Sequence, residues 1–124
     1  MTGRRTILVV EDDPDCLETM ADVLSRDGHE VVAVADGVQA LERLQSGLAP
    51  DLILLDLMLP KMDGWQFLRE CIDEPTAANT PIVVVSGEAN LRKRAAQLGV
   101  DFLEKPISIE QLRSVIARTR ADVS

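Results

Sequence analysis

Five short apolar runs, separated by longer stretches with helical spacing, constrain the fold of this chain more than any other feature. The runs are rich in Val, Ile and Leu, and most lack the polar alternation of a half-exposed strand. Continuous apolar strands are typical of a parallel sheet covered on both faces. The pattern therefore predicts a doubly wound α/β domain, with a five-stranded parallel sheet, helices on both faces and right-handed crossovers. The predicted strands are Ile7 to Val10, Val31 to Val34, Leu52 to Leu55, Ile82 to Val85, and Phe102 to Leu103.

The helices expected after the first two strands have recognisable starts and ends. Asp13 suits the N-cap of the first helix and Pro14 its first position, and Gly28 is expected to end it. The second helix is expected to begin at Asp36-Gly37 and to stop before Gly47. The residues expected to face the core are Cys16, Leu17, Met20, Val23 and Leu24 in the first helix, and Val38, Leu41 and Leu44 in the second.

Three further helices complete the alternation. The third is expected after Asp63-Gly64, the fourth from about Asn90 to Leu98, and the fifth from a capping box at Ser108 to Gln111. The fourth has a thin apolar side and carries an exposed basic run, Arg92-Lys93-Arg94. The apolar residues at helical spacing are Phe67, Leu68 and Cys71 or Ile72 in the third helix, and Ile109, Leu112 and Ile116 in the fifth.

Composition limits the classes of protein to which the chain can belong. With 124 residues, 46% of them hydrophobic and 27% charged, it has the size of one soluble domain, which we expect to span residues 1–124 around a core at about 6–121. We expect no membrane association and a cytoplasmic location, because no apolar stretch approaches the length of a bilayer span. We also expect no output domain, because the single domain accounts for the length of the chain. A net charge of −8 argues against direct binding of nucleic acid. Cys16 and Cys71 are isolated and are interpreted as buried free thiols.

Polar side chains follow four of the predicted strands, at the point where each strand ends. Glu11 and Asp12 follow the first, Asp56 the third, Ser86 the fourth and Lys105 the fifth. In doubly wound sheets ligands bind at this carboxyl edge. Two carboxylates about 4 Å apart repel by about 4 kcal/mol at an effective dielectric constant near 20, which a divalent cation such as Mg²⁺ would relieve. A nucleophilic carboxylate, a metal site, an ammonium and a hydroxyl are the groups that phosphoryl transfer requires.

Four separated motifs, in the right order, resemble the receiver domain of two-component response regulators, including the chemotaxis regulators. They are Glu11-Asp12-Asp13-Pro14, the segment from Asp56 through Pro60 to Gly64, Ser86-Gly87 and Lys105-Pro106, and they cover essentially the whole chain. The resemblance implies a flavodoxin-like fold and a non-enzymatic signal transduction protein. In that family a histidine kinase or a histidine phosphotransfer protein donates a phosphoryl group to the aspartate that corresponds to Asp56.

The resemblance also implies a role for each site residue. Asp12, Asp56 and the backbone carbonyl of Met58 would bind Mg²⁺ or Mn²⁺, and Glu11 would act mostly through a metal-bound water. Lys105 would contact the phosphoryl group, and Ser86 would donate a hydrogen bond to it. Ser86 and Phe102 would be the switch residues, and Phe102 would change rotamer on activation. A cis peptide bond between Lys105 and Pro106 is a further expectation of the family. No cofactor other than the metal is implied.

Three positions depart from the common family pattern or vary within it. Ser86 stands where threonine is most frequent, and the hydroxyl is kept. Met58, two residues after the phosphoacceptor, and Glu88, two residues after the switch hydroxyl, occupy positions that influence how water reaches the phosphoryl group. The three aspartates that we interpret as helix caps or turn formers rather than site residues are Asp13, Asp36 and Asp63.

Three alternatives compete with this interpretation. A haloacid-dehalogenase-type phosphatase needs a second aspartate two residues after its nucleophile, where this chain has Met58. A flavin or nucleotide binder needs a Gly, Ser and Thr loop after the first strand, where the acidic run from Glu11 would repel a phosphate. A receiver-like interaction module that signals without phosphorylation usually lacks an acid or the lysine, and none is missing here.

Output is expected to pass through a surface rather than through an attached domain. The resemblance points to the fourth helix, the fifth strand and the fifth helix as that surface, for an unidentified downstream protein or for a homodimer. The basic run Arg92-Lys93-Arg94 suits an acidic partner or a salt-bridged dimer, and equally a solvated helix face.

Overall fold

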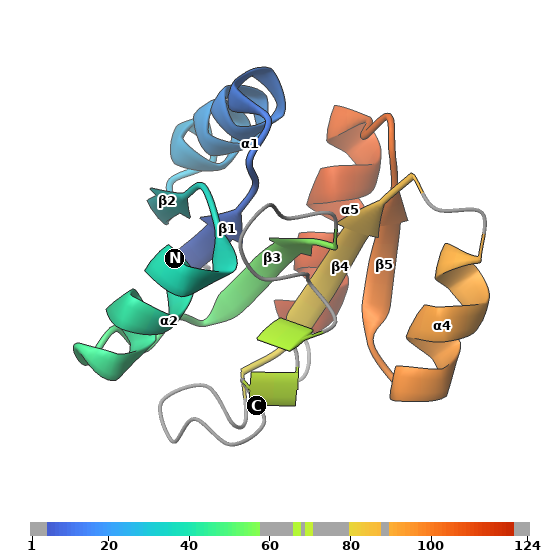
Figure 1. The fold of residues 1–124 in the computed structure, drawn as a ribbon. Helices are drawn as coiled ribbons and strands as arrows, with labels where there is room; N and C mark the ends of the chain where they lie inside the picture. The colour runs from blue at the N-terminus through green and yellow to red at the C-terminus, as the bar shows by residue number, and fades with distance from the viewer. Residues whose placement is uncertain (1–4, 58–65, 68, 71–79, 88–89, 121–124) are drawn as a thin grey trace.

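The computed structural model describes residues 5–57, 66–67, 69–70, 80–87 and 90–120. Its centre is a parallel sheet of five strands in the order β2-β1-β3-β4-β5 (Figure 1). This is the order of the flavodoxin-like doubly wound fold, so the predicted fold class is confirmed. The strands are β1 (Thr6–Val10), β2 (Glu30–Val34), β3 (Leu52–Asp56), β4 (Ile82–Ser86) and β5 (Asp101–Glu104).

The register brings the carboxyl ends of the three central strands together. Val10 at the end of β1 pairs with Leu55, and Asp56 at the end of β3 pairs with Val85. Ser86 at the end of β4 pairs with Glu104 at the end of β5. Each predicted strand is present, and β3 and β4 extend one residue further than their apolar runs, so that Asp56 and Ser86 are themselves the last residues of strands.

Helices cover both faces of the sheet, as the apolar strands require. On one face α1 and α5 enclose a core with the inward residues of the central strands, and on the other α2 and α4 do the same (Figure 1). Every residue of β3 is buried, because this strand lies in the middle of the sheet between the two helical layers. The helices whose two ends both lie among the described residues are α1 (Pro14–Arg26), α2 (Gly37–Gln45), α4 (Leu91–Leu98) and α5 (Ile109–Arg120).

Local sequence signals set the helix ends. The side chain of Asp13 accepts a hydrogen bond from the N–H of Asp15 at 3.2 Å, and that of Asp36 accepts one from Gln39 at 2.8 Å. Both residues are therefore helix caps, as predicted. The capping role of Ser108 is also confirmed, because its hydroxyl oxygen accepts the N–H of Gln111 at 3.0 Å.

One helix face differs from the prediction. Val38 was expected in the core but is 39% exposed. The buried stripe of α2 consists of Gly37, Ala40 and Leu44, and at about 100° per residue Val38 lies well to the side of that stripe. In α5, Leu112 and Ile116 are buried, whereas Ile109, the first residue of the helix, is 46% exposed.

The third predicted helix lies mostly outside the described residues. Within it, residues 66–67 and 69–70 are helical, and Phe67 is fully buried, as expected from its spacing. Asp63, Gly64, Leu68, Cys71 and Ile72 belong to the part that the structure does not describe. No helix among the described residues is long and apolar enough to span a bilayer.

Candidate functional site

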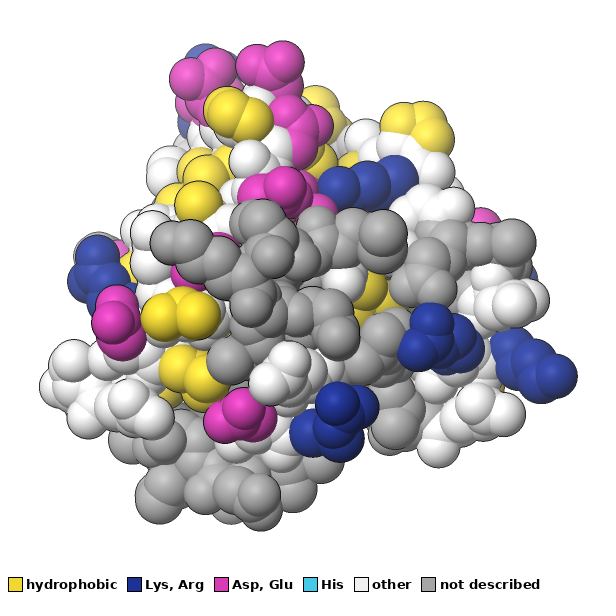
Figure 2. Space-filling model, in the orientation of Figure 1, with side chains coloured by type: hydrophobic (Ala, Val, Ile, Leu, Met, Phe, Trp, Pro, Cys, Tyr) yellow, Lys and Arg dark blue, Asp and Glu magenta, His cyan; other side chains and the backbone are white. Residues whose placement is uncertain are grey.

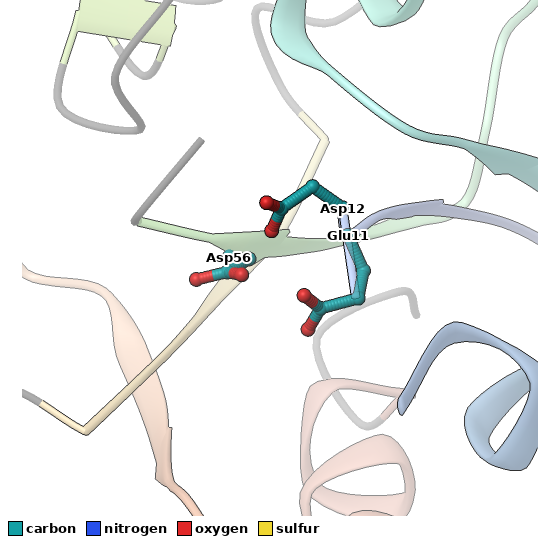
Figure 3. A group of neighbouring side chains, drawn as sticks. All are labelled: Glu11, Asp12 and Asp56. Carbon is teal, nitrogen blue, oxygen red and sulfur yellow. The ribbon is translucent and has the colours of Figure 1, made fainter. Parts of the chain in front are cut away.

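Three carboxylates meet at the carboxyl edge of the sheet. Glu11 and Asp12 directly follow β1, and Asp56 ends the neighbouring strand β3. One ligand oxygen from each residue lies within 4.8 Å of those from the other two. Figure 3 shows the three side chains at adjacent strand ends, turned toward a common space. The structure thus brings together the three acidic side chains that the sequence predicted as metal ligands.

Burial makes this cluster costly unless it is compensated. Glu11 is fully buried and Asp56 is 3% exposed, while Asp12 is exposed to solvent. One oxygen of Glu11, Oε2, accepts the backbone N–H of Asp13 at 3.1 Å. The other, Oε1, is also buried and has the ammonium of Lys105 3.0 Å away. One ammonium shared by this group of three carboxylates leaves a net negative charge, which a divalent cation would balance.

Lys105 supplies a positive charge to the same pocket. Its Nζ lies 3.0 Å from Oε1 of Glu11 and donates a hydrogen bond to Oδ2 of Asp56 at 3.2 Å. Burial lowers the pKa of Lys105, but contact with Glu11 and the charges of Asp56 and Glu11 outweigh burial and raise the pKa to about 12. The ammonium is therefore a fixed charge at neutral pH, as the sequence analysis expected.

Backbone hydrogen bonds hold the ends of β4 and β5 side by side. The N–H of Lys105 donates to the carbonyl oxygen of Ser86 at 3.0 Å, next to the Ser86–Glu104 pair of the ladder. Ser86 is fully buried at the end of its strand. The Lys105–Pro106 peptide bond is cis, which confirms that expectation.

Phe102 does not line the acidic pocket, and lies lower on β5, opposite Val84. It is half-buried and packs against the core between the sheet, α2 and α4. The guanidinium of Arg92 lies over its ring, 5.5 Å from the centroid. The sequence predicts an exposed Arg92 but not this contact, because the order of residues does not tell which α4 side chain crosses β5.

Cys16 lies nearer to the pocket than the sequence suggested. It is a free thiol and only half-buried, and its side chain hydrogen-bonds to Glu11. Burial, together with the charge and the hydrogen bond of Glu11, raises the pKa of Cys16 to about 12. The thiol is therefore protonated and a poor nucleophile at neutral pH. It lines a groove of about 510 Å³ between α1 and α5, and Lys105 lines the same groove.

The donor set fits a hard divalent cation. Carboxylate oxygens from Glu11, Asp12 and Asp56 are the ligands that Mg²⁺ and Mn²⁺ prefer, and a small number of protein ligands suits Mg²⁺, which keeps several waters. Met58, whose backbone carbonyl was predicted to join them, lies outside the described residues, as does Glu88.

Comparison with known proteins gives a consistent set of relatives. A family model described as response regulator receiver domain matches residues 7–117. The response regulator MprA of Mycobacterium ulcerans (strain Agy99) is 35% identical over 123 residues, which cover 94% of this chain and 52% of that protein. The chain therefore spans about half the length of the curated relatives that it matches.

Two solved structures have the same fold as this chain, and one of them contains a metal ion. The receiver domain of sensor histidine kinase PA1611 from Pseudomonas aeruginosa PAO1 is 29% identical, with a TM-score of 0.85, over 96% of this chain and 99% of that one. Its structure has a magnesium ion coordinated in the active site cleft. The chemotaxis response regulator CheY4 of Vibrio cholerae is 27% identical, with a TM-score of 0.85, over 94% of this chain and 99% of that one.

Proposed function

This chain belongs to the response regulator receiver domain family, and from that premise we propose that Asp56 accepts a phosphoryl group in a Mg²⁺-dependent reaction. A receiver domain is a signalling module rather than a conventional enzyme. The observation that carries the proposal is the position of Asp56: it is buried at a strand end, beside two further carboxylates and 3.2 Å from the Lys105 ammonium. The donor would be a phosphorylated histidine of a histidine kinase or of a histidine phosphotransfer protein.

The chemistry follows from the groups around Asp56. A carboxylate oxygen of Asp56 would attack phosphorus, forming a P–O bond as the P–N bond of the phosphohistidine breaks and the imidazole leaves. Lys105 already contacts Asp56 and would remain beside the new phosphoryl group, balancing its negative charge. Ser86, on the adjoining strand, would donate its hydroxyl hydrogen to a phosphoryl oxygen.

The acidic residues beside Asp56 would hold the metal. Asp12 and Asp56 would be its direct ligands together with the carbonyl of Met58, and Glu11 would bind through water. When bound, Mg²⁺ would neutralise the charge that develops on the phosphoryl oxygens. The magnesium in the cleft of the PA1611 receiver domain supports this assignment.

Phosphorylation would then change a binding surface. Ser86 and Phe102 are the proposed switch residues, and the surface is the one formed by α4, β5 and α5, around Arg92, Arg94 and Phe102. A downstream protein or a second copy of this chain would bind there. The basic run of α4 on a chain of net charge −8 supports an acidic partner.

The proposal is tested by replacing Asp56 with Asn, a nearly isosteric residue that is not a nucleophile. Wild-type protein incubated with acetyl phosphate and Mg²⁺ should gain one phosphoryl group in an intact-mass measurement, and Asp56→Asn should gain none. Thermal unfolding of both proteins would confirm that the variant is folded. Uptake by the Asn variant at the wild-type rate would refute the site, and absence of uptake by the wild type would favour an interaction module that works without phosphorylation.

A further inference from the structure

Arg92 bridges two side chains of β5 from the outside. Its Nη2 lies 3.2 Å from Oε1 of Glu104, to which it donates a hydrogen bond, and its guanidinium carbon lies 5.5 Å from the centre of the Phe102 ring. One side chain from α4 therefore holds an aromatic ring by a cation–π contact and a carboxylate by an ion pair. A planar guanidinium can do both at once, which a lysine ammonium cannot.

The alternation of the strand explains why the two targets lie on the same side. Phe102 and Glu104 are two residues apart on β5, so both point to the face of the sheet that α4 covers. Leu103, between them, points to the opposite core. Glu104 is also the ladder partner of Ser86, the proposed switch hydroxyl, so the bridge is anchored next to the phosphorylation pocket.

Phe102 lies where a change of position is sterically feasible. It is half-buried at the border of its core cluster, and it lines a surface hollow of about 200 Å³ together with Gln111 and Ser114 of α5. Arg92 and Glu104 line the same hollow. Figure 2 shows Lys and Arg side chains on the side of the molecule that carries α4. The ring is thus held under a cationic side chain rather than enclosed on all sides.

We propose that the Arg92–Phe102–Glu104 bridge is a latch that favours the unphosphorylated conformation. The proposal rests on the proposed function, in which phosphorylation of Asp56 moves Ser86 and turns Phe102 inward. In this structure the ammonium of Lys105 is paired with Asp56 itself, and the bridge is present together with that pairing. If Phe102 turns inward, the ring leaves the guanidinium, so the cation–π contact is present in one state and lost in the other.

This differential contact sets the direction of the effect. A contact made only in the unphosphorylated state opposes any ligand that selects the other state. Both Arg92 and Glu104 are largely exposed, so each contact is weak, and removal of the bridge should tighten binding of a phosphoryl mimic by about threefold to tenfold. The latch would thus set how much of the protein is switched on at a given level of phosphorylation.

The test is the affinity of the full chain for beryllium fluoride in the presence of Mg²⁺, measured by calorimetry or by NMR titration. Arg92→Ala should bind the mimic about threefold to tenfold more tightly than wild type. Arg43→Ala is the matched control, since it removes one exposed arginine charge from α2, outside the proposed signalling surface. Its affinity should equal that of the wild type.

A second background separates the latch from a general effect of charge. In Phe102→Leu protein, the further change Arg92→Ala should leave the affinity unchanged, because the ring that the guanidinium holds is absent. Unchanged or weaker binding by Arg92→Ala alone, or equal gains from Arg43→Ala, would overturn the latch while the wild type still bound the mimic. Failure of the wild type to bind the mimic at all would overturn the proposed function, and the latch with it.

Discussion

At the scale of single residues, the positive charge of Lys105 offsets the repulsion between the buried carboxylates of the acidic pocket. Its ammonium lies within 3.2 Å of an oxygen of Asp56 and 3.0 Å from one of Glu11, two carboxylates that are almost wholly buried. The pKa of Lys105 is raised from 10.5 to about 12. A raised lysine pKa stabilises the fold fully below the unfolded value and loses that contribution only as the pH rises through the folded value. The ion pair is therefore intact at neutral pH.

Replacing Lys105 with Met should destabilise the protein at pH 7 in the absence of divalent cations. The change keeps an unbranched side chain that is one atom shorter, but it leaves two buried carboxylates without their cation. We expect this loss to lower the free energy of unfolding by about 1–3 kcal/mol. Urea denaturation followed by circular dichroism measures it. Lys93→Ala, at an exposed position, should change the stability by less than about 0.5 kcal/mol. Equal stabilities of Lys105→Met and wild type would contradict the electrostatic account.

The residues of the pocket could be predicted because their positions depend on strand ends, which are visible in the sequence. Asp56 and Lys105 each follow an apolar run, and parallel strands bring such positions to one edge. The contacts of Cys16 with Glu11 and of Arg92 with Phe102 could not be predicted. They depend on how a helix lies across the sheet, and helical spacing says only which face points inward.

At the scale of elements, the strands were easier to predict than the helix faces. All five apolar runs are strands, and only their ends shift, because the ladder continues for as long as a neighbour can pair. In α2 the apolar pattern allowed more than one stripe, and the helix buries Gly37 and Ala40 while Val38 is 39% exposed. Small residues such as these give little signal in a hydrophobic pattern.

β5 shows how one strand serves two functions. Its side chains alternate, so Leu103 packs in the core under α1 and α5, whereas Phe102 faces α4. Asp101, on the same side of the strand as Leu103, lies 3.6 Å from Arg118 of α5. The strand therefore contacts both of its neighbouring helices and ends at the pocket, which makes it the natural connection between Asp56 and the proposed signalling surface.

At the scale of the whole molecule, the site lies where the strand order reverses. The chain proceeds from β1 to β2 on one side and returns to β3 on the other, so the ends of β1 and β3 border a crevice at the carboxyl edge. In open α/β sheets that crevice is the usual ligand site. Glu11, Asp12 and Asp56 occupy it. The alternation of strands and helices thus predicts the strand order, and the strand order predicts that the site lies between the ends of β1 and β3.

Magnesium should stabilise the whole domain, because the carboxylates converge only in the folded state. Binding to the native state alone adds about 1.4 kcal/mol at ten times the dissociation constant. The melting temperature should therefore rise with millimolar Mg²⁺ in wild type, and this rise should be lost in Asp12→Ala. Glu18→Ala, which removes an exposed acid from α1 outside the cluster, should keep the full response. The same rise in Asp12→Ala as in wild type would mean that Mg²⁺ acts elsewhere.

The most direct test of the central claim is to locate the phosphoryl group chemically. An acyl phosphate on an aspartate is reduced by borohydride to homoserine, which peptide mass spectrometry assigns to one position. After incubation with acetyl phosphate and Mg²⁺, we predict homoserine at position 56 of the wild type and none when Mg²⁺ is replaced by a chelator. Homoserine at position 12 or 13, or an unmodified Asp56 peptide under conditions in which the protein is folded and binds Mg²⁺, would contradict the account.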